Sequence, residues 1–370
     1  MGTGVRRYGV IGDIALRVAF VASVLAVALT IAGTASAAEP IPIKVVVVTM
    51  FEIGEDTGDT PGEFQNWVEK FPLPETLPFP QGYRHLRYNP EKGVLGIVTG
   101  VGTARSASSI MALGMDPRFD LTKAYWLVAG IAGVNPQMGS LGSAAWAEWV
   151  VDADLGHEID PREMPADWPT GHFPLSKNKP YEEPVPADTG GAVYHLDPGL
   201  VAWAYGVSRD VKLDDSEALQ KLRAHYDGYP EAQRPPFVFR GDDLSGENFW
   251  HGKLMNDWAV SWVQYWTGGA GHFAMTAMED TGTLQALTFL SHAGRADVRR
   301  ALVLRTASNY SMQYPGETAA ESLAHEHAGG YSAFIPSLVA AYRVGSRVVD
   351  EIATHWDLDA DRIPTIGEAQ

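Results

Sequence analysis

Three short segments in the second half of the chain carry side chains suited to holding a small polar ligand. They are SGENFW at residues 245–250, AMEDTG at 277–282 and LRTASN at 304–309. The first offers an aromatic ring in Phe249, the second a carboxylate in Glu279 at a helix start, and the third an amide in Asn309 at a strand end. A nucleoside needs such a set: a flat face for the base, a carboxylate for the ribose hydroxyls and a polar group at the purine edge.

Each of these three residues also has an ordinary structural explanation. Glu279 could be a charge at a helix terminus, Asn309 a turn residue and Phe249 a ring of the core. The segments follow a β–α–β start in a fixed order along the chain, and this order favours the ligand-binding interpretation.

A glycine turn at residues 100–102 offers a second kind of site. Its Gly-Val-Gly sequence resembles the start of a dinucleotide fingerprint, but Ala104 and Arg105 stand where a third glycine would follow. The backbone N–H groups of Gly102 and its neighbours, at a helix N-terminus, suit an anion or a polar ligand atom. Packing alone is the alternative reason for these glycines.

Other familiar catalytic patterns have no counterpart in the sequence. His-Glu-His at residues 325–327 has no third ligand at a recognisable spacing, so we predict a surface turn there and no metal ion. Serine-hydrolase, zinc-protease and P-loop motifs are missing, and no cofactor is expected. The chain has no cysteine, which excludes thiolate chemistry and disulfides.

The elements that must position these residues begin in a β–α–β order. Apolar runs at residues 45–50, 94–99 and 125–129 are typical of strands buried on both faces of a sheet. A segment rich in small residues, 103–113, predicts a helix before the third strand, which should end at the glycine-containing run 130–133. This pattern predicts an α/β fold.

The second half of the chain completes the sheet. Residues 154–240 are rich in Pro, Gly and aromatic side chains, and we interpret them as an elaborated insertion packed on the sheet. Regular elements return with a helix through 277–291, a strand at 301–306 and a closing helix at 339–353. We therefore expect residues 38–370 to form a single domain.

Two family resemblances rest on motifs of this kind. The segments FEIGE at 51–55, DTPGEF at 59–64 and GDDLSGE at 241–247 resemble the purine nucleoside permease family, over nearly the whole chain after residue 37. The order of glycine turn, strand end, SGENF, Met-Glu and RTASN is similar to that of the nucleoside phosphorylase and nucleosidase superfamily. The resemblance implies a phosphorylase-like three-layer fold with a mixed, mostly parallel central sheet and an elaborated insertion.

The resemblance also implies roles for individual residues. Glu279 would bind the ribose, with Met278 as the apolar floor under the sugar and Phe249 against the base. The two catalytic residues would be Asn309 at the purine edge and Glu52, which would activate water. The further substrate contacts are Gly102, Gly133 and Ser308.

Together these roles imply cleavage of the N-glycosidic bond of a purine nucleoside, with inosine, guanosine and adenosine as candidates. Phosphorolysis needs Arg and Ser side chains for phosphate, and the strand at 127–133 offers neither, although Arg105 could substitute. Hydrolysis is therefore favoured. A non-catalytic nucleoside-binding protein that assists uptake stays open, because Asn309 cannot donate a proton where nucleosidases have an Asp.

The first 37 residues have the features of a signal peptide. Arg6, Arg7 and Arg17 precede an apolar run at 18–32, and Ala-Ser-Ala at 35–37 fits a cleavage site. A membrane anchor is the alternative, but the run is shorter than the roughly 20 residues that span a bilayer. We therefore expect a secreted or periplasmic protein with no membrane span.

The charge of the chain limits its partners. The formal net charge is −17, and the signal segment is itself basic, so the processed chain is still more acidic. An acidic surface repels phosphate backbones, which argues against nucleic acid as a partner. Assembly into a homo-oligomer is left open by the sequence.

We predict that the processed protein begins at or within about two residues of Ala38, because cleavage follows the Ala-Ser-Ala site. N-terminal sequencing of protein recovered outside the cytoplasm checks this. A membrane-bound protein that keeps residues 1–37 would contradict it.

Overall fold

The computed structural model of the chain describes residues 1–2, 39–187, 189–329 and 333–365. From Ile41 onward the chain forms one compact unit. Apart from the first two residues, the expected signal peptide lies outside the described residues, as does Ala38.

Strands and helices alternate through most of this unit. The strands of its main sheet are β2 (Val45–Thr49), β3 (Glu75–Leu77), β4 (Leu86–Asn89), β5 (Val94–Val98), β7 (Tyr125–Val134), β8 (Ala144–Ala147), β9 (Trp149–Asp152), β12 (Val193–His195), β13 (Val238–Arg240), β14 (Asp242–Ser245), β15 (Phe273–Ala277) and β16 (Ala301–Tyr310). Two separate short pairs are β1 (Ile41–Pro42) with β6 (Phe119–Asp120) and β10 (His157–Glu158) with β11 (His172–Phe173). The helices are α2 (Gln65–Lys70), α3 (Thr103–Gly114), α4 (Pro198–Ser208), α5 (Glu217–Arg223), α6 (Lys253–Trp266), α7 (Asp280–His292), the 3₁₀ turn η1 (Val298–Arg300), α8 (Ala319–Gly329), α9 (Phe334–Thr354) and α10 (Trp356–Asp359).

The main sheet is built around β2. This strand lies between β5 and β7, parallel to both, and β7 is in turn parallel to β16. Every residue of β2 is buried, as expected for a β-branched strand covered on both faces. The predicted β–α–β order is confirmed, since α3 leads from β5 towards β7.

Antiparallel strands make the sheet mixed. The main path runs β12-β9-β14-β15-β7-β2-β5-β4-β3, while β16 pairs with both β7 and β8, and β8 with β13. Strand β15 is antiparallel to β7, and β16 is antiparallel to β8. The sheet thus matches the mixed architecture expected from the sequence.

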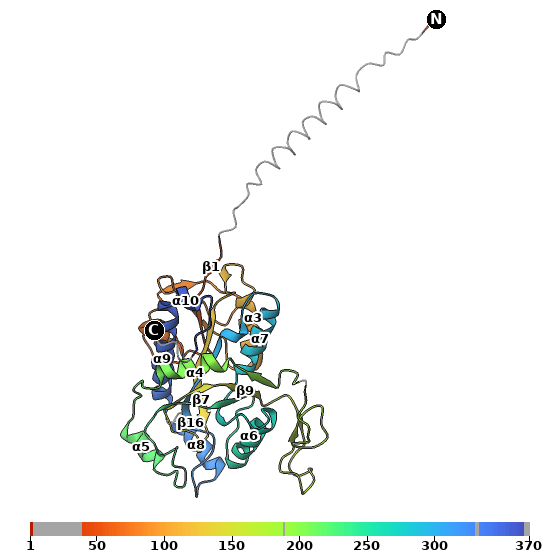
Figure 1. Ribbon diagram of the computed structural model, residues 1–370, viewed down its shortest axis with the longest axis vertical. Coiled ribbons are helices and arrows are strands. Elements are labelled where there is room, and N and C mark those ends of the chain that lie inside the picture. The colour runs from red at the N-terminus through yellow and green to blue at the C-terminus, as the bar shows by residue number, and fades with distance from the viewer. Residues whose placement is uncertain (3–38, 188, 330–332, 366–370) are drawn as a thin grey trace. The chain divides into compact units, whose positions relative to one another are not determined.

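Helices cover both faces of the sheet (Figure 1). Helix α9 packs along β16, β7 and β2, with α4 against it. On the other side α3 packs against α7, and α6 lies against β15. The three-layer α/β fold expected from the sequence is confirmed.

Several predicted boundaries are wrong: β16 runs on to Tyr310, and the closing helix α9 begins already at Phe334. Residues 130–133 lie inside β7 and not at a strand end, because β7 continues along β16 as far as Val134. Ala277 closes β15, so that α7 begins only at Asp280.

The surface turn predicted at residues 325–327 is a helix, α8. Its start has a reciprocal cap: Glu321 N–H donates to Thr318 Oγ1 at 3.2 Å, and Thr318 N–H donates to Glu321 Oε2 at 3.0 Å. This is a capping box, T-x-x-E, which the sequence analysis overlooked. The side chain of His327 lies outside the described residues.

The segment expected as an insertion is partly woven into the sheet. Of its elements, β12 pairs with β9 and β13 pairs with β8, while α4 packs against α9. The segment therefore contributes to the core as well as lying on it.

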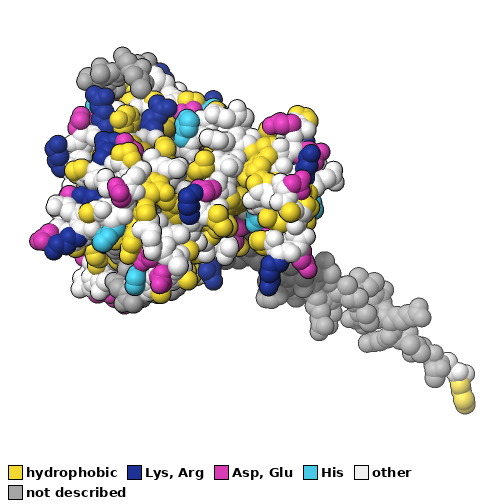
Figure 2. All heavy atoms as spheres, turned by 90° about the horizontal axis from the view of Figure 1, so that it is seen from below, with side chains coloured by type: hydrophobic (Ala, Val, Ile, Leu, Met, Phe, Trp, Pro, Cys, Tyr) yellow, Lys and Arg dark blue, Asp and Glu magenta, His cyan; other side chains and the backbone are white. Residues whose placement is uncertain are grey.

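The surface shown in Figure 2 carries acidic and basic side chains interspersed with apolar ones. In the described part of the chain, each helix is too short or too polar to cross a membrane.

Candidate functional site

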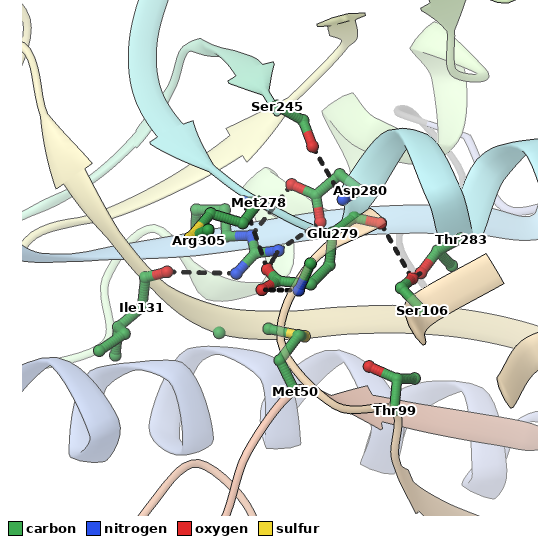
Figure 3. A network of polar contacts seen from close by, with 12 residues as sticks. Met50, Thr99, Ser106, Ile131, Ser245, Met278, Glu279, Asp280, Thr283 and Arg305 are labelled. Carbon is green, nitrogen blue, oxygen red and sulfur yellow. Dashed lines mark hydrogen bonds and ion pairs between the residues drawn. The ribbon is translucent and has the colours of Figure 1, made fainter. Parts of the chain in front are cut away.

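Several elements converge on one buried cation, Arg305 of β16 (Figure 3). Its side chain is 2% exposed. Its Nε and Nη2 donate to the two carboxylate oxygens of Asp280 at 3.0 and 2.6 Å. Nη2 also lies 2.9 Å from Glu279 Oε2, and Nη1 donates to the Ile131 carbonyl at 3.1 Å. All three guanidinium nitrogens are thus fixed.

The two carboxylates reach Arg305 because they stand at the start of α7. Asp280 is the first residue of the helix, and its N–H donates to Ser245 Oγ at 3.0 Å. Acidic side chains at a helix N-terminus are stabilised by the helix dipole. Glu279 is the preceding residue, so one helix start directs both carboxylates towards the cation.

Asp243 of β14 adds a third buried carboxyl group. Neither of its oxygens has a hydrogen-bond partner among the described residues. Burial raises the pKa of Asp243 well above its usual range, and Asp280 raises it further. Burial therefore favours the neutral form of the Asp243 carboxyl group.

Glu63, just before α2, brings a fourth carboxyl group. Its Oε2 accepts the N–H of Met50 at 2.7 Å and its Oε1 accepts the N–H of Ile131 at 2.8 Å. Burial raises the pKa of Glu63 to about 8, a shift that Arg305 opposes and Glu279 strengthens. Burial also raises the pKa of Glu279. Three buried carboxyl groups with raised pKa values, Asp243, Glu63 and Glu279, thus lie near one cation.

Gly130 of β7 is the place where two of these groups meet. A Cβ on Gly130 would lie 2.6 Å from both Glu63 Oε1 and Arg305 Nη1, and 1.9 Å from Met50 Cε. A side chain there would displace the carboxyl group or the guanidinium. Close approach of charged groups explains this glycine inside a strand.

The N-terminus of α3 forms the next part of the site. The N–H of Gly102 donates to Glu279 Oε1 at 3.1 Å, and the N–H of Ala104 donates to Glu247 Oε1 at 2.8 Å. Gly102 has a φ of 99°, and a Cβ there would lie 2.4 Å from Glu247 Oε2, so the turn requires glycine. Two carboxylates of the protein itself thus occupy donors that an anion would use.

Asn309 lies near the end of β16, four residues beyond Arg305. Its Nδ2 donates to the Tyr310 carbonyl at 3.1 Å, and Ser308 Oγ donates to its Oδ1 at 2.9 Å. A Cβ on Gly133 of the adjacent strand would lie 3.5 Å from this Nδ2. Four residues of strand span about 13 Å. The site therefore has a carboxylate end at Arg305 and an amide end at Asn309.

Most of the sequence-predicted site residues lie at these two ends. At the carboxylate end are Gly102, Met278 and Glu279, and at the amide end are Gly133, Ser308 and Asn309. Phe249 lies on the loop after β14 and is 42% exposed. Arg105, the alternative phosphate ligand, is exposed on α3 and donates to the Val101 carbonyl at 2.9 Å.

Glu52 has a different setting from the one expected. Its carboxylate accepts hydrogen bonds from the backbone N–H groups of Ile53, Gly62, Phe64 and Gln65. These bonds brace the loop between β2 and α2, and Glu63 on that loop is the residue whose carboxyl group lies beside Gly130, close to the Arg305 guanidinium. The loop returns to the end of β2, where Glu63 N–H donates to the Phe51 carbonyl. Glu63 therefore lies next to Glu52 in space, and no local sequence pattern shows which of the two faces the site.

In the described part of the chain, no group of three or more His, Asp or Glu side chains is arranged to hold a metal ion.

Residues 42–362 match the model of a protein family described as purine nucleoside permease. The chain belongs to the purine nucleoside permease family. It is 32% identical over 284 residues to a protein of Schizosaccharomyces pombe named probable purine nucleoside permease, covering 74% of this chain and 80% of that protein. It is 30% identical over 319 residues to the purine nucleoside permease of Candida albicans, covering 85% of this chain and 76% of that one. The family expected from the sequence is confirmed.

Solved structures of nucleosidases share the fold of this permease-family chain. One is a mutant of the Helicobacter pylori nucleosidase MTAN with 5′-methylthioadenosine in its active site, and another is a mutant futalosine hydrolase from the same organism. Each has a TM-score of 0.50 and 16% identity, and covers 84% of this chain and 99% of its own. At this identity the likeness concerns the fold alone.

We predict that Gly130→Ala lowers the free energy of unfolding of this permease-family protein by about 1–3 kcal/mol, the usual cost of overpacking a filled core. Urea denaturation measures the change. Gly206→Ala is the matched control, because Gly206 is exposed in α4 and a Cβ there meets no atom within 4 Å. Alanine should stabilise that helix slightly. Equal effects of the two substitutions would contradict the assigned role of Gly130.

Proposed function

We propose that this protein binds a purine nucleoside and cleaves its N-glycosidic bond by hydrolysis, outside the cytoplasm. The observation that carries the proposal is a pair of buried carboxyl groups near one cation: Glu279, which is hydrogen-bonded to Arg305, and Glu63, whose pKa Arg305 influences. Buried acid–base groups with shifted pKa values are typical of catalytic sites. The family membership and the names of the relatives supply the substrate class.

In this proposal the ribose lies at the carboxylate end of the site. Glu279 accepts a hydrogen bond from a ribose hydroxyl, and its orientation is held by Arg305 and by the N–H of Gly102. Met278 packs beneath the sugar. Cleavage builds positive charge on the ribose, and carboxylates that are already fixed in place stabilise that charge.

Water is the proposed nucleophile. A phosphate would need the N-terminus of α3, where Glu279 and Glu247 accept the N–H groups of Gly102 and Ala104. It would also lie close to carboxylates, and Arg305 is already paired with Asp280. Both features oppose an anion and favour a neutral water molecule.

Glu63 takes the role that the sequence analysis gave to Glu52. To accept a proton from water Glu63 must be ionised, and its pKa of about 8 means that the ionised fraction grows as the pH rises through that value. The carboxylate would then receive the proton while the water oxygen bonds to the ribose C1′.

Nucleoside binding without cleavage, as one component of uptake, is the second candidate. Two observations favour it: Asn309 has no acidic proton, and Glu63 is largely protonated at neutral pH. The names of the fungal relatives also suggest transport.

We predict that incubation with inosine or guanosine releases the free purine base at the same rate with and without millimolar phosphate. Chromatography of the products, with a sugar analysis, measures both the rate and the second product. Free ribose supports hydrolysis. Ribose 1-phosphate would refute it, and intact nucleoside with measurable affinity would establish the binding protein.

We predict that Glu63→Gln lowers turnover by about 100-fold or more, the usual contribution of a general base. It should also abolish the rise in rate as the pH increases towards 8, because no titrating carboxyl group is left at this position. Glu52→Gln is the comparison: it should lower thermal stability by weakening the loop brace but keep this pH dependence. The opposite pattern would return the catalytic role to Glu52.

A further inference from the structure

Helix α8 brings a carboxyl group to the amide end of the site. Glu326 of this helix lies beside Asn309, whose side chain interacts with its carboxyl group. Its Oε2 is buried and has no hydrogen-bond partner in the part of the chain that the structure describes. A buried carboxyl oxygen without a partner is costly unless it is protonated or meets a ligand.

The surroundings of Glu326 favour its neutral form. Burial raises the pKa of Glu326 to about 8, Glu317 raises it as well, and the Asn309 amide opposes the shift. The phenol of Tyr226 also faces this pair of carboxyl groups, and it donates to the Met312 carbonyl at 2.9 Å. Among the described residues, the groups that shift this pKa include no cation. His325 pairs with Glu317 at 2.8 Å on the exposed side. Glu326 is thus mostly a carboxylic acid at neutral pH.

The purine edge needs what this acid can give. A 6-oxopurine presents two acceptors side by side, N7 and O6. Asn309 has one amide proton bound to the Tyr310 carbonyl, and its second is directed at the Glu326 carboxyl group, a partner that O6 of a bound purine would replace. N7 then requires a second donor, and during cleavage it requires a proton, which an amide cannot release.

We propose that Glu326 is the general acid of this site and protonates N7 of the departing purine. This inference rests on the proposed function and assigns the residue that completes it. The C1′–N9 bond breaks, its electron pair moves onto the purine, and the Glu326 proton passes to N7. Water bonds to C1′ and gives its proton to Glu63. The products are ribose and the free base, and the proton on Glu63 returns to Glu326 through solvent.

The test compares two substrates in Glu326→Gln. Inosine needs a proton at N7, whereas 7-methylguanosine already carries a positively charged base and needs none. Glu326→Gln should lower turnover of inosine by about 100-fold or more at neutral pH. It should change turnover of 7-methylguanosine by less than about 3-fold, since glutamine keeps the shape of the side chain.

The pH profile gives a second readout. Wild-type turnover of inosine should rise towards pH 8 as Glu63 loses its proton and fall above pH 8 as Glu326 loses its proton. This fall should disappear in Glu326→Gln. Glu321→Gln is the matched control, because it makes the same change on the exposed side of α8 and weakens the cap of the same helix. It should leave the ratio of the two substrates and the pH profile unchanged.

Three outcomes overturn the inference: equal losses on both substrates, no loss on either, or the inosine-specific loss appearing in Glu321→Gln as well.

If the wild-type protein cleaves neither nucleoside, the hydrolase proposal itself fails. In that case, measured affinities for nucleosides with and without N7 decide whether Glu326 faces N7. Wild type should bind inosine about 3- to 10-fold more tightly than 7-deazainosine, the value of one hydrogen bond, and Glu326→Met should remove the difference. Equal wild-type affinities would overturn the placement.

Discussion

The site depends on the burial of Arg305. A guanidinium taken out of water is costly unless fixed charges compensate it, and removal of one partner leaves the other uncompensated. Asp280 supplies the compensation through two hydrogen bonds. Burial raises the pKa values of Glu63, Glu279 and Asp243, the neighbouring carboxyl groups raise them further, and Arg305 only partly opposes the shift. Burial of several carboxyl groups around one cation thus gives Glu63 a pKa of about 8.

Two backbone features allow this arrangement. Gly130 lets a carboxyl group and a guanidinium approach the same point of β7, and Gly102 lets the chain turn tightly into α3. At the second turn the protein fills its own anion site with Glu247 and Glu279. The helix N-terminus has backbone donors that suit phosphate, but the two carboxyl groups there oppose its binding. The proposal of water as the nucleophile rests on these charges.

Binding and cleavage of a nucleoside would use the same contacts in this fold. The difference lies in whether a base and an acid stand at opposite ends of the ligand. Glu63 lies at the carboxylate end and Glu326 at the amide end, each with a pKa of about 8. In this chain a family named for transport has a fold that it shares with nucleosidases.

The sequence by itself determined the β–α–β start, the three-layer architecture, the family, and the candidates Glu279 and Asn309. These rest on local patterns: runs of buried β-branched residues, a glycine turn, and short motifs at the ends of strands. Only the tertiary structure distinguished the surroundings of Glu63 from those of Glu52, placed the Glu247 carboxylate at the N-terminus of α3 and brought Glu326 to Asn309. The residues next to these glutamates in the sequence do not indicate their positions in the fold. The raised pKa of a carboxyl group follows from burial and from neighbours that are distant along the chain.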